Sequence, residues 1–119
     1  MTREVIDRLI EHLGDGPSPD LADLYAEDAV IEVPLRGEHP QGREGYRAHL
    51  AEAAEVQRFD CVDVLGMYQT DDPEVLVYEL RLHGHVLATG EPLELTTITV
   101  TRVRDGLITW CRSYSGVPA

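Results

Sequence analysis

The first residues of the chain carry apolar side chains at helical spacing. Within residues 5–13 an apolar residue recurs every three or four positions, which places this set on one face of an amphipathic helix: Val5, Ile6, Leu9, Ile10 and Leu13. Gly14 and Pro17 follow and are typical of a helix end. The pattern therefore predicts a helix over 5–13.

The rest of the first half combines short elements with one longer helix. Ser18-Pro19-Asp20 is typical of a helix start and predicts a short second helix over 21–25. The apolar run at 29–33 predicts a strand. Glycine and proline between that strand and residue 43 indicate a loop over 35–42, and helical spacing returns at 43–55.

The second half alternates apolar and polar residues, as strands do. It predicts long strands over 59–69, 75–87, 93–104 and 107–115, the last two joined by an Asp105-Gly106 hairpin. Helices followed by a meander of antiparallel strands predict an α+β fold. The length of 119 residues predicts a single domain over 1–119.

Charge narrows the expected partners and location. Ten basic residues, all arginine, stand against 22 acidic residues and give a formal charge of −12. This sign repels phosphate, so neither nucleic acid nor an anionic membrane is an expected partner. No apolar run approaches the ~18 residues of a membrane span, and the first residues lack the apolar core of a signal peptide. We therefore expect a cytoplasmic protein.

Missing residue types exclude particular chemistries. The chain has no lysine for a Schiff base and no asparagine for a Cys-His-Asn arrangement. Its cysteines, Cys61 and Cys111, are expected to be free thiols. His83 and His85 are two apart on one strand face, which supplies too few ligands for a metal site, so a polar stripe with Glu79 and Arg81 is expected there.

The element order and several runs of sequence resemble a known superfamily. These runs are LYAEDAVIEVP, GREGYRAHL and VRDGLITWCRSYS. They resemble the nuclear transport factor 2-like superfamily, and within it the SnoaL-like and ketosteroid-isomerase-like branch, over residues 3–115. The resemblance implies a curved antiparallel sheet that forms a cone around N-terminal helices. It also implies a hydrophobic pocket in the cone, no metal or organic cofactor, and a homodimer.

The resemblance also locates the family's catalytic positions. Ketosteroid isomerases use an Asp base, with a Tyr and a protonated Asp that hydrogen-bond the developing enolate. These positions correspond to Val33, Leu9 and Thr99. Steroid isomerisation by that mechanism is therefore not expected. A tyrosine that supports the family's network corresponds to Tyr25, which is either a catalytic residue or plain core.

Three residues are the candidates for catalysis: Glu32, His49 and Tyr25. Glu32 is next to the family's base position. If it faces inward, desolvation raises its pKa and makes it a general base; if it faces outward, it is a surface acid. His49 is three residues after Tyr46 on the predicted helix, where a pocket histidine is a proton shuttle and a surface histidine is not.

Strand alternation and the aligned register place a set of side chains toward the pocket. The candidate ligand-binding residues are His12, Tyr46, Asp63, Leu80, Leu82, Thr97, Thr99, Cys111 and Ser113, with Thr101 and Ser115 on the same face. An apolar wall with hydroxyl groups suits a small, mostly apolar, oxygenated ligand. The alternative is a filled core in which these hydroxyls satisfy one another. On the opposite face, Trp110, Tyr114, Ile98 and Val100 predict an apolar patch that a second copy covers.

Together these features predict a SnoaL-like small-molecule enzyme that transfers protons without a cofactor, of isomerase, cyclase or dehydratase type. The alternative is a non-catalytic ligand-binding or assembly dimer that has lost the catalytic carboxylates. An open cone with a titratable side chain inside it favours the enzyme.

Overall fold

The computed structural model describes residues 2–37 and 39–116 of the chain. In chain order the elements are α1 (Thr2–Leu13), the 3₁₀ helix η1 (Pro19–Leu24), β1 (Tyr25–Glu32), the 3₁₀ helix η2 (Pro34–Arg36), α2 (Gly42–Ala54), β2 (Gln57–Gln69), β3 (Val75–Val86), β4 (Pro92–Arg104) and β5 (Leu107–Gly116). None of the described helices is long and apolar enough to cross a membrane.

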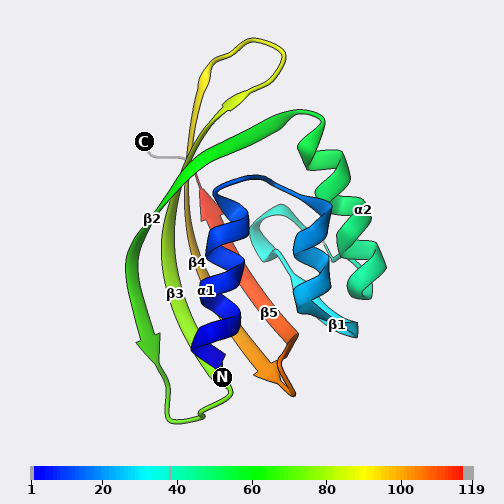
Figure 1. Cartoon of the computed structure of the whole chain (residues 1–119), viewed down its shortest axis with the longest axis vertical. Coiled ribbons are helices and arrows are strands. Elements are labelled where there is room, and N and C mark those ends of the chain that lie inside the picture. Colours follow the sequence, from blue (N-terminus) through cyan, green and yellow to red (C-terminus); the bar gives the residue numbers. More distant parts are fainter. Residues whose placement is uncertain (1, 38, 117–119) are drawn as a thin grey trace.

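In the described part of the chain the strands form one five-stranded sheet in the order β1-β5-β4-β3-β2. The strands β2 to β5 are an antiparallel meander, as predicted. Figure 1 shows the long strands curving around α1, with α2 beside β1. Helices on one side of a curved sheet confirm the α+β architecture.

One edge of the sheet differs from the antiparallel prediction. β1 pairs with β5 in parallel, with Ile31 opposite Cys111 and Glu32 opposite Arg112. The connection through α2 carries the chain from β1 at one edge to β2 at the other, because these strands end the sheet on opposite sides. The local pattern of apolar and polar residues does not indicate this pairing, because the pairing joins segments that are far apart in the sequence.

The predicted helix over 21–25 is also corrected by the structure. η1 ends at Leu24, and Tyr25 already belongs to β1, opposite Ile108. The Ser18 hydroxyl accepts a hydrogen bond from the Asp20 backbone N–H at 3.3 Å, which starts the short 3₁₀ turn. The strand thus begins four residues earlier than predicted, because pairing with β5 outweighs local helix preference.

The apolar positions found from the sequence make the core. In α1 the buried side chains are Val5, Ile6 and Leu9, and in β3 they are Leu76, Tyr78, Leu80 and Leu82. The side chains between them on β3 are half-buried on the outer face. Period-two alternation in β3 and helical spacing in α1 therefore meet in one core, as predicted.

Two irregularities in β2 bend the sheet. The register with β3 shifts between Phe59 and Cys61 and again between Val64 and Gly66. Near the first shift, Gly84 of β3 lies so close to Arg58 that any side chain at this position would overlap the Arg58 backbone. Bulges increase the local twist and bend of a strand. They give the sheet the concave face on which α1 packs.

Candidate functional site

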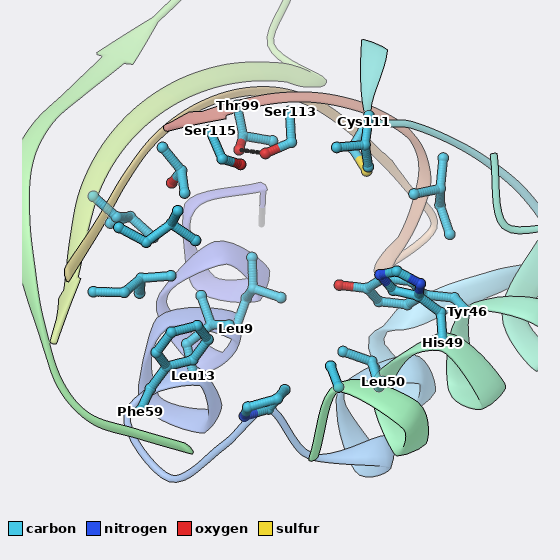
Figure 2. A pocket seen from close by; sticks show the side chains of 18 of the residues that line it. Leu9, Leu13, Tyr46, His49, Leu50, Phe59, Thr99, Cys111, Ser113 and Ser115 are labelled. Carbon is cyan, nitrogen blue, oxygen red and sulfur yellow. Dashed lines mark hydrogen bonds between the residues drawn. The ribbon is translucent and has the colours of Figure 1, made fainter. Parts of the chain in front are cut away.

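A cavity of about 180 Å³ lies between the concave face of the sheet, α1 and α2 (Figure 2). Its apolar lining is Leu9, Leu13, Pro17, Ile31, Val33, Leu50, Ala53, Phe59, Leu80, Leu82 and Leu95. Its polar lining is Tyr25, Arg36, Tyr46, His49, Gln57, Tyr78, Thr97, Thr99, Cys111, Ser113 and Ser115. The interior is therefore open, and the alternative of a filled core does not hold.

Hydroxyl side chains of β4 and β5 form one wall of the cavity. The sheet register places Thr97 opposite Ser115 and Thr99 opposite Ser113. The hydroxyls of Thr99 and Ser113 are 3.0 Å apart and hydrogen-bonded. Opposite residues of an antiparallel pair share a face, so the four side chains form a compact group.

Two tyrosines bring neutral hydroxyl groups to the same cavity. The rings of Tyr25 and Tyr46 are 4.6 Å apart between centroids. Burial raises the pKa of Tyr46 to about 12 and raises that of Tyr25 well above its ordinary value. The two tyrosines interact through a side-chain hydrogen bond, which raises the pKa of Tyr25 and lowers that of Tyr46. Both keep their protons near neutral pH.

His49 is the imidazole of the cavity lining. It lies one turn after Tyr46 on α2, with the rings stacked at 6.3 Å between centroids. Figure 2 shows both side chains projecting from α2 toward the cavity. Its imidazole therefore lies at the wall, where the sequence analysis placed a candidate proton carrier.

Arginine side chains hold α2 in the position that aims these rings. Arg43 Nε donates to the Tyr25 backbone oxygen at 2.8 Å, which ties α2 to β1. Arg47 donates to the Pro19 backbone oxygen at 3.2 Å and to Asp23 at 2.7 Å, which ties α2 to η1. These bonds tie α2, which carries Tyr46 and His49, to both β1 and η1.

Cys111 lines the cavity as a neutral thiol. Burial raises its pKa to about 12, while a hydrogen bond from Tyr25 acts in the opposite direction. A thiol that keeps its proton is a poor nucleophile. Cys111 therefore contributes shape and polarizability to the wall.

Glu32 does not reach the cavity. It accepts hydrogen bonds from Trp110 Nε1 at 3.1 Å and from Arg112 Nε at 3.0 Å. The Arg112 hydrogen bond, followed by that of Trp110, holds the pKa of Glu32 below its usual range. The inward orientation that would make Glu32 a general base is therefore wrong, because Ile31 and Val33 occupy the inner positions on either side of it.

Two candidate ligand-binding residues also lie elsewhere. His12 is exposed on α1, away from the lining residues Leu9 and Leu13. Asp63 is exposed on β2 and pairs with His83, with 2.8 Å between Oδ2 and Nε2. The prediction that these two residues line the cavity is therefore wrong. His12 lies on the solvent side of α1, opposite its apolar stripe. Asp63 lies on the outer face of the sheet with Arg81 and His83.

The other candidates lie in the cavity lining: Tyr25, Tyr46, His49, Leu80, Leu82, Thr97, Thr99, Cys111 and Ser113. The sequence analysis did not name the polar lining residues Arg36, Gln57 and Tyr78 as candidates. Gln57 alternates with Phe59, so an earlier start of that strand would have included it. Arg36 lies in η2 inside the predicted loop, where no periodicity marks an inward side chain.

The family's catalytic positions do converge on this cavity. Val33, Leu9 and Thr99 all line it, and none of them carries an ionisable side chain. Among the described residues of the lining there is no aspartate or glutamate. Proton transfer at this site therefore cannot use a carboxylate at those three positions.

No set of three His, Cys, Asp or Glu side chains within residues 2–37 and 39–116 is placed to hold a metal ion. His83 and His85 lie on the outer face and pair with Asp63 and Asp60, at 2.8 Å and 3.0 Å. Both histidines thus belong to a stripe of polar side chains on the outer face, as the sequence analysis expected.

The predicted apolar patch is on the outer face of β4 and β5. Ile98 and Tyr114 are 43% and 40% exposed, and Val100 and Trp110 are half-buried. Their neighbours along each strand, such as Thr99 and Ser113, face the cavity. The pairing of this patch with a second copy stays a prediction.

The chain is similar to known proteins in both sequence and structure. Residues 6–111 match the SnoaL-like domain family. A candidate isomerase from Bacillus subtilis has a similar structure, with a TM-score of 0.86 at 22% identity over 97% of this chain and 86% of that one. A protein of ketosteroid isomerase-like fold from Catenulispora acidiphila gives 0.79 at 20% identity, over 96% and 86% of the two chains.

A third similar structure is a candidate polyketide cyclase from Pseudomonas putida. Its TM-score is 0.82 at 20% identity, over 96% of this chain and 90% of that one. At these identities the likeness shows a shared fold, including the curved sheet that encloses the cavity.

Proposed function

The chain belongs to the SnoaL-like domain family, and from this premise we propose that it is an enzyme that moves a proton on a small molecule bound in its cavity. Solved proteins of the same fold include a candidate isomerase and a candidate polyketide cyclase. Isomerisation, cyclisation and dehydration share one step, the removal of a proton from carbon next to a carbonyl group. The proposed substrate is a mostly apolar, oxygenated molecule.

The observation that carries this proposal is the pairing of His49 with Tyr46 at the cavity wall. His49 supplies an imidazole as the base, and Tyr46 supplies a hydroxyl that keeps its proton. In this scheme His49 takes the proton from carbon while the Tyr46 hydroxyl donates to the carbonyl oxygen, on which negative charge develops. Tyr25 lies beside Tyr46 and holds its ring in place.

The next step decides the reaction type. When His49 returns the proton to a different carbon of the enolate, the result is an isomer. When the enolate carbon attacks a second carbonyl of the same molecule and the alkoxide formed there takes the proton from His49, the result is a ring that carries a hydroxyl. When a neighbouring hydroxyl leaves and takes the proton from His49, the result is a dehydrated product and water. Each route uses the same two side chains.

The test needs no knowledge of the natural substrate. We expect the protein to exchange the protons next to the carbonyl of cyclohexanone for deuterium in D₂O, followed by NMR. His49→Ala should slow this exchange by about 100-fold or more, because it removes the base. His12→Ala is the matched control, since it removes an exposed histidine of α1, and it should leave the rate unchanged.

A second candidate function is ligand binding without chemistry. The apolar or neutral residues at Val33, Leu9 and Thr99 favour it, because the family's acids are missing there. Binding without chemistry predicts that cyclohexanone shifts the NMR signals of the cavity residues while its protons exchange no faster than in buffer. That result, or exchange that His49→Ala leaves intact, would overturn the proposed enzyme.

A further inference from the structure

We infer that the natural ligand of this cavity is a single-ring compound with at least two oxygen substituents on one edge, held by Thr97, Thr99, Ser113 and Ser115. This inference deepens the proposed function and rests on the same cavity. It concerns what the cavity binds, and it requires no proton transfer.

Size sets the first limit. A dry protein cavity of about 150 Å³ holds one benzene ring. The cavity here measures about 180 Å³, which leaves room for a ring and small substituents. A steroid, with its four fused rings, does not fit in this volume.

The four hydroxyl side chains set the number of oxygens. They form two cross-strand pairs, Thr99 with Ser113 and Thr97 with Ser115. The pairs are two residues apart along each strand, which is about 7 Å. A single oxygen at one pair is therefore out of reach of the other, and a ligand that satisfies both pairs needs two.

The second pair, Thr97 with Ser115, is the pair whose hydroxyls are open to a ligand oxygen. Thr99 and Ser113 hydrogen-bond to each other at 3.0 Å. The hydroxyls of Thr97 and Ser115 have no hydrogen-bond partner among the described residues, although Thr97 is only 8% exposed and lines the cavity. Both hydroxyl oxygens stay accessible, so an oxygen of the ligand or of water can meet them in the cavity.

The apolar side of the cavity orients the ring. Leu9, Leu13 and Phe59 lie across the cavity from Thr99, Ser113 and Ser115 in Figure 2. A ring that places its unsubstituted edge on these side chains turns its oxygen-bearing edge toward β4 and β5. The lining thus separates an apolar end from a hydroxyl wall, which matches a ligand with oxygens on one edge.

The test is direct binding of matched probes to the full chain, by calorimetry and by NMR shifts of the cavity residues. The probes are toluene, phenol and the three dihydroxybenzenes, with a dihydroxynaphthalene and estradiol as larger compounds. At least one dihydroxybenzene should bind about three- to tenfold more tightly than phenol, because it gains one hydrogen bond. The larger compounds should cause no shift at cavity residues.

Variants of the hydroxyl wall test whether Thr97 and Ser115 cause the difference in affinity. Thr97→Val combined with Ser115→Ala should remove the advantage of the dihydroxybenzene over phenol. Thr97→Ser, which keeps the hydroxyl, should retain it. Thr96→Val is the matched control on the outer face of the same strand and should change neither affinity. Thermal unfolding of each variant shows whether the fold is intact, and the Thr97→Ser result keeps the test valid if the double variant is unstable.

Three results would overturn the inference: equal binding of toluene, phenol and the diols; binding of estradiol in the cavity; or no binding of any single-ring diol. The outcome is separate from that of the proposed function. Proton exchange without a preference for two oxygens would remove this inference alone, and diol binding without exchange would remove the proton transfer alone.

Discussion

Glu32 and Val33 are neighbours in the chain, yet they face opposite sides of the sheet. Val33 lines the cavity, and Glu32 is held on the other side by Trp110 and Arg112. A shift of one residue along a strand exchanges its faces. The choice between a general base and a surface acid was therefore a question of register, and it was decided by the pairing of β1 with β5.

Glu32 should contribute to stability in a pH-dependent way. Its folded-state pKa lies below the ordinary value, so its ionised form stabilises the fold above the ordinary carboxyl range. That contribution is lost as the pH falls through the lowered pKa. Glu32→Gln should therefore lower the free energy of unfolding at pH 7 and reduce its loss on acidification, as measured by urea unfolding from pH 7 to pH 3.

Glu52→Gln is the control for this experiment, because Glu52 is exposed on α2 and has no ion pair among those found in the described residues. An identical pH profile for Glu32→Gln and the wild type would contradict the assigned role. Glu32→Gln should also leave deuterium exchange of cyclohexanone unchanged, since Glu32 does not line the cavity.

At the scale of elements, the cavity exists because β2 and β3 bend. The bend is concentrated at the β2 register shifts and at Gly84, where the Arg58 backbone approaches closely. A flat sheet would leave α1 and α2 without a concave face to cover. Gly84 thus affects the cavity indirectly, because it allows the strand bend that shapes the cavity wall.

Gly84→Ala should destabilise the protein by about 1–3 kcal/mol, the usual cost of forcing an added methyl group into a packed position. Gly116→Ala is the matched control, because a side chain there meets nothing within 4 Å. Urea unfolding of both variants measures the difference. Equal stability of the Gly84→Ala and Gly116→Ala variants would contradict this prediction, because it would mean that the strands at Gly84 separate at little cost.

At the scale of the whole molecule, the two faces of the sheet have different properties. The inner face closes the cavity, and the outer face exposes apolar side chains of Ile98 and Tyr114 beside charged groups. With a net charge of −12, unspecific association of copies is opposed by repulsion. A self-association through this patch would have to be specific, with two-fold symmetry.

We propose such a homodimer through Trp110, Tyr114, Ile98 and Val100. Sedimentation should report about twice the chain mass of 13.3 kDa at micromolar concentration. Ile98→Glu should shift the protein to monomer, because it places a charge in the apolar patch. Val56→Glu, at an exposed position outside the patch, is the control. A wild-type monomer would contradict the proposal.

The sequence by itself determined which residues are apolar and at what spacing, and this was enough for much of the fold. The helical spacing of Val5 and Leu9 and the alternation of Leu80 and Leu82 follow from local geometry. The alternation, together with the register that the family resemblance implies, also placed Thr97, Thr99, Cys111 and Ser113 toward the interior.

Only the tertiary structure decided the rest, because it depends on contacts between distant segments. The pairing of β1 with β5 moved Tyr25 from a helix to a strand and turned Glu32 away from the cavity. The packing of α2 placed the neighbouring Tyr46 and His49 at the cavity wall. The volume of the cavity depends on how far the sheet bends and how closely the helices approach it, and no local pattern of residues records either distance.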